Sequence, residues 1–194
     1  MLKIGITGGI GSGKTTVSKV FQALGIPVFY SDAEAIKILQ SVPVRKKIKK
    51  TFGKEVFDKS EMVDRKLLAK EVFGDTTKLK KLNAIIHPAV AKAFEAWVKK
   101  NKTAPYILKE AAILFESGAH KQVDKVITVT APLLLRIERV MKREGFTKYQ
   151  VKERVKQQWS DKEKIKRSDF VIVNDEKKMI IPQVLEIHKN LALQ

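Results

Sequence analysis

The chain has 194 residues, no cysteine and three histidines. The absence of cysteine excludes disulfides, thiolate metal sites and cysteine nucleophiles, and no apolar run approaches the roughly 20 residues of a membrane-spanning helix. The hydrophobic fraction of 44% and the charged fraction of 31% are typical of a globular domain. The net charge of +18 favours an anionic partner, although a solvated lysine-rich surface gives the same balance. The start is too short and too soon glycine-rich for a signal peptide, so we expect a cytoplasmic protein.

The arginines are concentrated in one part of the chain. Seven of the 39 basic residues are arginine, and five of those seven lie between positions 136 and 167. A guanidinium group presents a planar fork that matches phosphate oxygens, whereas a lysine ammonium is a point charge. We therefore predict that this segment contacts phosphate. Arg136, Arg139 and Arg143 are three and four residues apart, so they share one helix face.

The first elements alternate between strand and helix. Residues 2–7 form a short apolar strand that runs into a glycine-rich segment, and 14–24 carry apolar residues at helical spacing before Gly25 ends the helix. Residues 26–32 follow as a second apolar strand with Asp32 at its carboxyl end. Strand, helix and strand in this order form a βαβ unit, which predicts an α/β fold with a parallel sheet.

The middle of the chain is helical and basic. Asp64 is placed to cap a helix that breaks at 74–76, and an apolar helical stripe resumes at Leu79. We expect His87 and Pro88 to interrupt this stripe and form a helical hairpin, because the residue before proline is disfavoured in helical geometry. Residues 33–102 therefore form a helical insertion that covers another part of the protein.

The strand pattern returns in the last third. Strands are expected at 105–108, 123–132 and 170–173, with a last helix at 178–192. Residues 136–167 are charged and helical, and apart from Trp159 they show almost no apolar groups that look buried. That pattern is typical of a solvent-exposed lid. We thus expect a core formed by 1–32, 103–135 and 168–194, with the insertion 33–102 and the lid 136–167.

The segment Gly8–Thr15, GGIGSGKT, has the spacing G-x-x-x-x-G-K-[ST] of a phosphate-binding loop, or P-loop. Its glycines allow backbone N–H groups to surround phosphate oxygens, and the following helix adds the positive end of its dipole. We expect Lys14 to contact the β- and γ-phosphates and the Thr15 hydroxyl to bind Mg²⁺. The predicted ATP-binding residues are Gly11, Ser12, Gly13, Lys14, Thr15 and Thr16.

A P-loop predicts that the protein binds a nucleotide, but it does not identify the reaction. A GTPase would need N-K-x-D and D-x-x-G segments, but the chain has only Asn101–Ala104 (NKTA) and no D-x-x-G. A nucleic-acid motor usually needs a second domain, for which this chain has no room. A small-molecule kinase needs a carboxylate near the acceptor hydroxyl, an acceptor-binding insertion and an arginine-bearing lid, and all three are predicted. A nucleoside or nucleotide kinase and a nucleic-acid-binding ATPase remain as alternatives.

Three carboxylates and one histidine are candidates for the chemistry. Asp32 would orient the acceptor hydroxyl and accept its proton, although it also suits a helix N-cap. Glu110 ends the third strand and would hold a magnesium-bound water. Glu116 would bind the acceptor or cap a helix, and both glutamates are also compatible with surface charge. A lone histidine such as His87 is compatible with a structural role.

The chain resembles the dephospho-CoA kinase family over nearly its whole length. The segments that carry the resemblance are TGGIGSGKTT (7–16), Val63-Asp64-Arg65 with Leu68, LNAIIHP (82–88), ILFE (113–116), Ala131-Pro132 with Arg139 and Arg143, and SDFVIVN (168–174). Two segments depart from the family pattern. The family usually has D-A-D where this chain has Tyr30-Ser31-Asp32, and Ala112 replaces the proline of P-L-L-F-E.

The resemblance implies a parallel-sheet P-loop nucleotide kinase core with a helical acceptor-binding insertion and a helical lid. It implies transfer of the ATP γ-phosphoryl group, with Mg²⁺, to the ribose 3′-hydroxyl of dephospho-CoA, the last step of coenzyme A synthesis. No nucleic acid or membrane is expected as a partner, and the oligomeric state stays open, with a monomer favoured. The implied catalytic residues are Asp32, Lys14, Arg139 and Arg143; the acceptor residues are Asp32, Arg65, His87, Leu114, Phe115 and Glu116; and the metal residues are Thr15 and Glu110.

Overall fold

The computed structural model describes residues 1–193. Its strands are β1 (Leu2–Thr7), β2 (Val28–Tyr30), β3 (Tyr106–Glu110), β4 (Lys125–Thr130) and β5 (Phe170–Val173). The α-helices are α1 (Lys14–Ala23), α2 (Ser31–Leu39), α3 (Val42–Phe52), α4 (Arg65–Val72), α5 (Thr76–Lys100), α6 (Leu133–Glu144), α7 (Lys148–Lys156), α8 (Asp161–Lys166) and α9 (Ile180–Ala192), with a 3-10 turn η1 at Ala119–Gln122. The chain divides into two compact units, of which the smaller is Ser31–Lys99 and the larger is Met1–Tyr30 with the chain from Lys100 onward. Over residues 1–193, no helix is both long and apolar enough to cross a bilayer.

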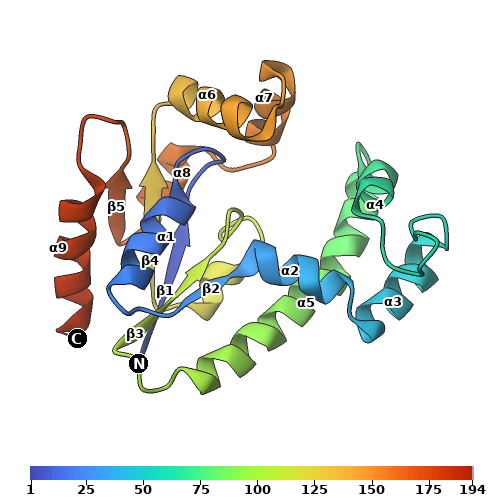
Figure 1. Cartoon of the computed structure of the whole chain (residues 1–194), viewed down its shortest axis with the longest axis horizontal. Helices are drawn as coiled ribbons and strands as arrows, with labels where there is room; N and C mark the ends of the chain where they lie inside the picture. Colours follow the sequence, from blue (N-terminus) through green and yellow to red (C-terminus); the bar gives the residue numbers. More distant parts are fainter. Residues whose placement is uncertain (194) are drawn as a thin grey trace. The chain divides into compact units, whose positions relative to one another are not determined.

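The larger unit is built on a five-stranded sheet in the order β2-β3-β1-β4-β5, with every pair parallel (Figure 1). The central strand β1 pairs with β3 on one side and β4 on the other, and Ile6 lies opposite both Glu110 and Ile127. Helices connect the other consecutive strands, and β3 and β4 are joined by residues 111–124 with the 3-10 turn η1. Parallel pairing requires long crossover connections of this kind. The predicted α/β fold with a parallel sheet is therefore confirmed.

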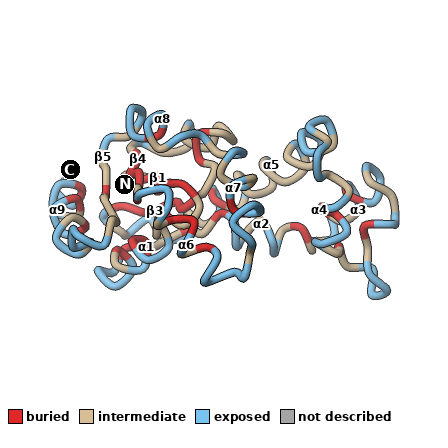
Figure 2. The backbone as a smooth tube through the Cα atoms, turned by 90° about the horizontal axis from the view of Figure 1, so that it is seen from above, coloured by how far each residue is buried: buried red, intermediate tan, exposed pale blue. Residues whose placement is uncertain are grey.

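The two faces of the sheet are covered by different segments. Side chains alternate along each strand, and the face that carries Ile4, Ile6 and Leu108 packs against α1 and α9 in one buried cluster. Val126 of the opposite face packs against the segment 111–123. The strands β1, β3 and β4 are mostly buried (Figure 2). This core packs against both faces of the central strands.

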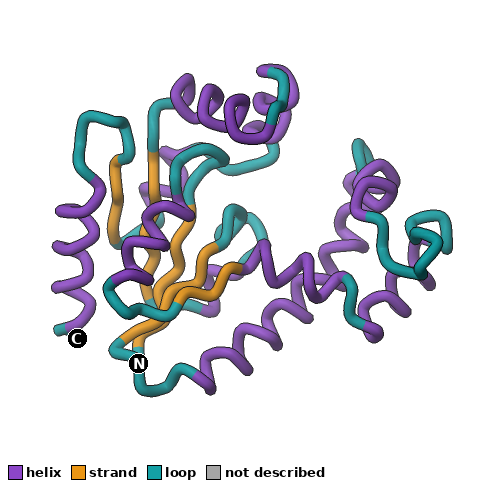
Figure 3. Tube along the Cα trace, in the orientation of Figure 1, coloured by secondary structure: helices purple, strands orange, loops and turns teal. Residues whose placement is uncertain are grey.

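The parallel direction of the strands brings their carboxyl ends to one edge of the sheet. The loops that leave β1, β3, β4 and β5 start at that edge (Figure 3). Gly8 follows β1, Glu110 ends β3 and Asn174 follows β5. Open α/β sheets bind their ligands at this edge, so the fold places the glycine-rich loop where a ligand site is expected.

The smaller unit has a hydrophobic core of its own. The predicted cap is confirmed, because Asp64 Oδ1 accepts hydrogen bonds from the N–H groups of Lys66 at 2.7 Å and Leu67 at 3.1 Å and so starts α4. The predicted break is confirmed as well, since α4 ends at Val72 and α5 begins at Thr76. The buried members of the core are Leu39, Val44, Ile48, Val56, Val63 and Leu68.

The predicted hairpin at His87 and Pro88 is wrong. Helix α5 runs from Thr76 to Lys100 with Pro88 inside it. A proline inside a helix removes one hydrogen bond and costs about 3 kcal/mol. Apolar residues on both sides of Pro88 pack against the core of the smaller unit, and such burial is worth up to about 1.5–3 kcal/mol per side chain; these residues are Leu82, Ile85, Ile86 and Ala89. Their packing offsets the lost hydrogen bond.

The prediction that 136–167 lacks buried apolar groups, apart from Trp159, is also wrong. Ile137, Val140 and Val151 are at most 3% exposed and pack together with Ile10 of the glycine-rich loop. Trp159, in contrast, is 38% exposed. The many charged residues of α6 and α7 conceal a narrow apolar stripe in the sequence. These two helices therefore share a small core that reaches the loop after β1.

Candidate active site

The glycine-rich loop forms a tight turn that leads directly into α1. Ser12 N donates to Gly9 O at 3.0 Å, and Gly11 and Gly13 have φ angles of 79° and 92°, which other residues rarely adopt. Gly13 is the N-cap of α1, so Lys14 is the first helical residue. The first N–H groups of a helix lack intrahelical partners, and they bind oxyanions. The loop and the first turn of α1 thus have a geometry that can bind phosphate oxygens.

The two predicted metal residues lie next to each other. Thr15 Oγ1 is 3.3 Å from Glu110 Oε2, and Glu110 is 7% exposed at the end of β3. A hydroxyl and a carboxylate supply the hard oxygen ligands that Mg²⁺ prefers, usually together with substrate phosphates and water. The residues at this position therefore fit a magnesium ion that accompanies a bound nucleotide.

Tyr30 stands at the position where the resemblance expects an aspartate. Its hydroxyl lies 3.2 Å from Gln22 Oε1. Burial, and then the negative charge of Glu110, raise the pKa of Tyr30 above its usual value. Tyr30 is therefore neutral at pH 7, and Glu110 supplies the carboxylate at this end of the β2–β3 pair.

Asn174 connects the last strand to the phosphate-binding loop. Its Nδ2 donates to Ser12 O at 2.8 Å, and a Cβ atom on Gly13 would collide with the same amide. Arg139 of α6 donates to Asn174 O at 3.1 Å and forms an ion pair with Glu176 at 3.0 Å. Arg139, a predicted catalytic residue, therefore reaches the loop through Asn174.

Arg136 lies against the loop itself. It is 7% exposed, and its Nη1 is 2.9 Å from Asp161 Oδ1, while Asp161 Oδ2 accepts from Thr130 Oγ1 at 2.7 Å. A Cβ atom on Gly9 would overlap the Arg136 guanidinium, so a larger residue there would force that side chain to shift. Sequence reasoning included Arg136 in a cluster and missed Asp161. The helical spacing of Arg136 and Arg139 was the signal for the first, and no sequence signal indicated the second.

The third arginine of that face is at the surface. The side chain of Arg143 is 63% exposed, and it pairs with the neighbouring Glu144 at 3.0 Å. The structure therefore separates the three arginines, with Arg136 buried against the loop, Arg139 held at its edge and Arg143 exposed on the last turn of α6.

The predicted acceptor residues of the larger unit lie just after β3. Leu114 is fully buried and Phe115 is 5% exposed, so both contribute to packing. Glu116 Oε1 accepts from Trp159 N at 2.8 Å and lies 3.0 Å from Lys164 Nζ. The sequence did not indicate these two partners.

The remaining acceptor residues belong to the smaller unit. Asp32 is in the first turn of α2 and not at the end of the strand, because β2 ends at Tyr30 and the chain turns directly into a helix. Asp32 and Arg65, the first residue of α4, are exposed. His87 is half-buried in α5, and burial lowers its pKa below the usual value, so the ring is neutral at pH 7.

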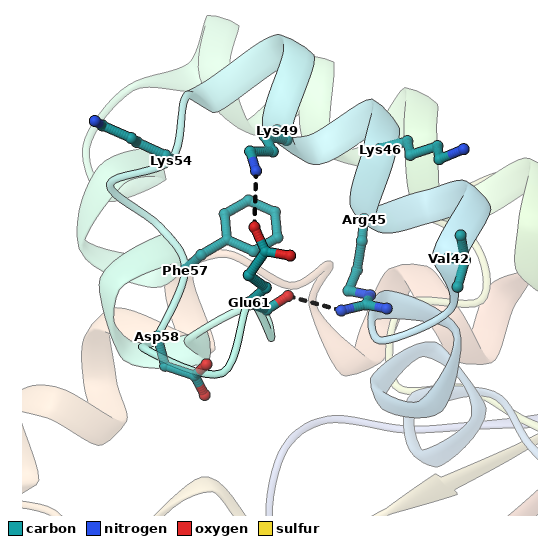
Figure 4. Close-up of a pocket in the computed structure, with 8 residues that line it drawn as sticks. All are labelled: Val42, Arg45, Lys46, Lys49, Lys54, Phe57, Asp58 and Glu61. Carbon is teal, nitrogen blue, oxygen red and sulfur yellow. Dashed lines mark hydrogen bonds and ion pairs between the residues drawn. The ribbon is translucent and has the colours of Figure 1, made fainter.

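The smaller unit also contains a cavity of about 500 Å³ between α3 and the following loop (Figure 4). Glu61 lies in this cavity, where its carboxylate pairs with Lys49 at 3.2 Å and its carbonyl oxygen accepts from Arg45 at 2.7 Å. The lining residues are Val42, Arg45, Lys46, Lys49, Lys54, Phe57, Asp58 and Glu61. The sequence-predicted site residues are not among those that line this cavity.

Comparison with known proteins connects these features to one family. The family model described as dephospho-CoA kinase matches residues 2–179. The dephospho-CoA kinase of Bacteroides fragilis (strain YCH46) is 43% identical over 187 residues, which are 96% of this chain and 91% of the relative. That of Aquifex aeolicus is 40% identical and covers 90% of this chain and 89% of its own length.

Solved structures agree with the sequence relatives. The crystal structure of TT1252 from Thermus thermophilus superposes with a TM-score of 0.86 at 32% identity and covers 99% of this chain and 96% of its own. The dephospho-CoA kinase from Campylobacter jejuni has a TM-score of 0.70 at 27% identity, with coverages of 98% and 97%. The chain therefore belongs to the dephospho-CoA kinase family, whose enzymes are transferases that carry out the ATP-dependent phosphorylation of dephospho-CoA in the final step of coenzyme A biosynthesis.

Proposed function

We propose that this chain transfers the γ-phosphoryl group of ATP to the ribose 3′-hydroxyl of dephospho-CoA and releases coenzyme A and ADP. The observation that carries the proposal is the phosphate-binding loop with Thr15 beside Glu110 at 3.3 Å, in a chain that matches the family over residues 2–179. Because ATP is the donor, we expect the reaction to take place in the cytoplasm.

Binding of the donor is assigned to the loop and α1. The backbone N–H groups after Gly9 and the dipole of α1 bind the phosphates, and Lys14 adds a charge at the β- and γ-phosphates. Most of the catalysis in phosphoryl transfer comes from positioning and from electrostatic stabilisation of the transferring group. Thr15 and Glu110 would hold Mg²⁺, which neutralises phosphate charge when it is bound.

Activation of the acceptor is assigned to Asp32. An exposed carboxylate orients the 3′-hydroxyl by accepting its hydrogen bond and takes the proton as transfer proceeds. Arg65 is exposed at the start of α4, where its planar fork suits the diphosphate of dephospho-CoA. His87, neutral at pH 7, contributes a hydrogen bond rather than a charge. The compact helical unit Ser31–Lys99 supports the proposal of an acceptor-binding insertion.

Exclusion of water is assigned to the lid. Helices α6 and α7 pack on Ile10 of the loop and carry Arg139 and Arg143. Closure of this segment over bound substrates would bring Arg143 from solvent to the phosphates and exclude water, which otherwise competes as the acceptor.

A coupled ADP-release assay tests the reaction. Dephospho-CoA, nucleosides and single-stranded DNA are supplied separately to the full chain with ATP and Mg²⁺, and Lys14→Ala serves as the inactive control. We expect turnover with dephospho-CoA alone and formation of coenzyme A detected by mass. Turnover with a nucleoside, or DNA-stimulated ATP hydrolysis without coenzyme A, would overturn the proposal in favour of the corresponding alternative.

A further inference from the structure

The segment Gln158–Lys164 is attached to both sides of the candidate active site. On the donor side, Ile10 N of the phosphate-binding loop donates to Gln158 Oε1 at 2.8 Å. On the acceptor side, Trp159 and Lys164 contact the segment 112–116 that follows β3. Two functional segments far apart in the sequence are therefore joined by the same seven residues.

Lys164 is the most deeply buried residue of the segment Gln158–Lys164. Its side chain is 0% exposed, and its Nζ donates to Ala112 O at 3.0 Å and lies 3.0 Å from Glu116 Oε1. A buried ammonium group loses its hydration, and only close partners compensate for that loss. Two such partners are present, and both belong to one short segment, so the charge holds that segment in one arrangement.

The two oxygens of the Glu116 carboxylate differ in their hydrogen bonding. Its Oε1 accepts from both Trp159 N–H and Lys164, whereas Oε2 is buried and has no hydrogen-bond partner among the described residues. A buried carboxylate oxygen that lacks a hydrogen-bond donor costs free energy of folding, so such an atom in a folded protein requires an explanation. With Oε1 held by these two partners, Oε2 is positioned to accept a hydrogen bond from an N–H or O–H group of a ligand.

Aromatic contacts also hold the segment 112–116. The rings of Phe115 and Trp159 are stacked with centroids 5.8 Å apart and an interplanar angle of 2°. The Arg167 guanidinium lies 5.0 Å from the Trp159 ring centroid. Any shift of residues 112–116 would therefore change the surroundings of the Trp159 indole.

We propose that Lys164 is a positioning residue for dephospho-CoA, because it holds Glu116 and Ala112 O so that Glu116 Oε2 stays available to a hydroxyl or amide N–H of the acceptor. The inference rests on the proposed function and on the family resemblance, which implies Phe115 and Glu116 as acceptor residues. Lys164 acts through Glu116, so its loss weakens use of dephospho-CoA and leaves ATP binding unchanged.

The test compares Lys164→Met with Lys166→Met, which removes an exposed lysine from the same helix. Methionine keeps the apolar stem and removes the charge. For Lys164→Met we expect KM for dephospho-CoA to rise at least tenfold, with KM for ATP within threefold of the wild type. Lys166→Met should stay within twofold for both substrates. Equal behaviour of the two variants, or an equal loss for ATP and dephospho-CoA, would overturn the proposal.

The double variant Lys164→Met/Glu116→Gln separates positioning from general stability. If Lys164 acts through Glu116, the increases in KM for dephospho-CoA are not additive, because both single changes disturb the same carboxylate. Additive increases would contradict the mechanism. If Lys164→Met does not fold, Glu116→Gln alone decides, since its amide oxygen still accepts from Trp159 N–H, while the negative charge is lost and an NH2 donor replaces the acceptor Oε2. A wild-type KM for dephospho-CoA in that variant would overturn the proposal.

Fluorescence provides a readout that does not depend on turnover. The chain has two tryptophans, and Trp97→Phe leaves Trp159 as the single reporter. Dephospho-CoA without ATP should change Trp159 emission, and Lys164→Met should abolish that change. No change with saturating dephospho-CoA would contradict the inference. Failure of the proposed function is distinguished by the assay of the wild type, which would then form no coenzyme A at all.

Discussion

Thr15 Oγ1 and Glu110 Oε2 lie 3.3 Å apart although the two residues are 95 positions apart in the chain. The contact follows from the sheet, because β1 and β3 are parallel neighbours with Ile6 opposite Glu110. The phosphate-binding loop leaves β1 and returns Thr15 to the end of β3. Two oxygen-bearing side chains from different elements thus meet beside the loop.

Replacement of Thr15 by valine should weaken the use of magnesium. Valine keeps the shape and removes one oxygen ligand, and a lost interaction with a charged partner costs about 1.5–3 kcal/mol. We expect the Mg²⁺ concentration for half-maximal rate to rise at least tenfold, measured by ADP release at fixed ATP. Thr103→Val, at an exposed position outside the loop, is the control. An unchanged magnesium dependence would argue against Thr15 as a ligand.

Lys14→Ala should remove activity and leave the fold intact. The loss of one electrostatic donor at a preorganised site costs roughly 3–4 kcal/mol of transition-state stabilisation, which is about two to three orders of magnitude in kcat. Lys19→Ala removes an exposed lysine from the same helix and should be silent. Circular dichroism checks the fold of both variants. Activity of Lys14→Ala within tenfold of the wild type would refute the assignment of the loop.

Asp32→Asn should affect the acceptor and not ATP. Asparagine keeps the shape and a hydrogen-bonding oxygen but cannot take the proton, so kcat should fall by about 10² or more. Calorimetry should show unchanged affinity for ATP. Glu34→Gln, in the same first turn of α2, is the matched control. If ATP binding is lost instead, Asp32 belongs to the metal site.

Replacement of Arg139 or Arg143 of α6 by lysine should lower activity, and only the replacement of Arg139 should also lower stability. Arg139→Lys and Arg143→Lys should each lose at least tenfold in kcat/KM, about 1.4 kcal/mol, because lysine cannot reproduce a planar fork. Only Arg139→Lys should also lower the melting temperature, since Arg139 holds Asn174 and Glu176. Arg45→Lys, where one N–H binds a carbonyl oxygen, should be near neutral in kcat/KM. Equal tolerance of all three changes would refute the lid assignment.

The buried Lys109 should make stability depend on pH. It is 2% exposed and bonded to Gln122, and burial lowers its pKa from 10.5 to about 8. Between these values the unfolded chain binds a proton that the folded chain lacks, so the free energy of unfolding rises with pH in that window. The increase amounts to at most about 3 kcal/mol. Urea unfolding of the wild type and Lys109→Met from pH 7.5 to 10.5 measures it, and parallel curves for the two proteins would contradict the prediction.

Local sequence patterns were reliable where one interaction decided the structure. The cap at Asp64 depends on contacts with the next three residues, so it could be predicted. The continuity of α5 through Pro88 could not, because packing of side chains on both sides outweighs a local preference. The buried stripe of Ile137 and Val140 was likewise missed among the charges of α6.

The sequence by itself determined the phosphate-binding loop, because its residues are contiguous and its chemistry belongs to the backbone and to Lys14 and Thr15. It also determined the parallel sheet, since the order of strands and helices follows from local periodicity. Only the tertiary structure decided which distant side chains complete the site. Glu110 beside Thr15, Asn174 on Ser12 O, Asp161 on Arg136 and Lys164 on Glu116 are such pairs. These contacts depend on strand order, register and burial, which no local pattern encodes.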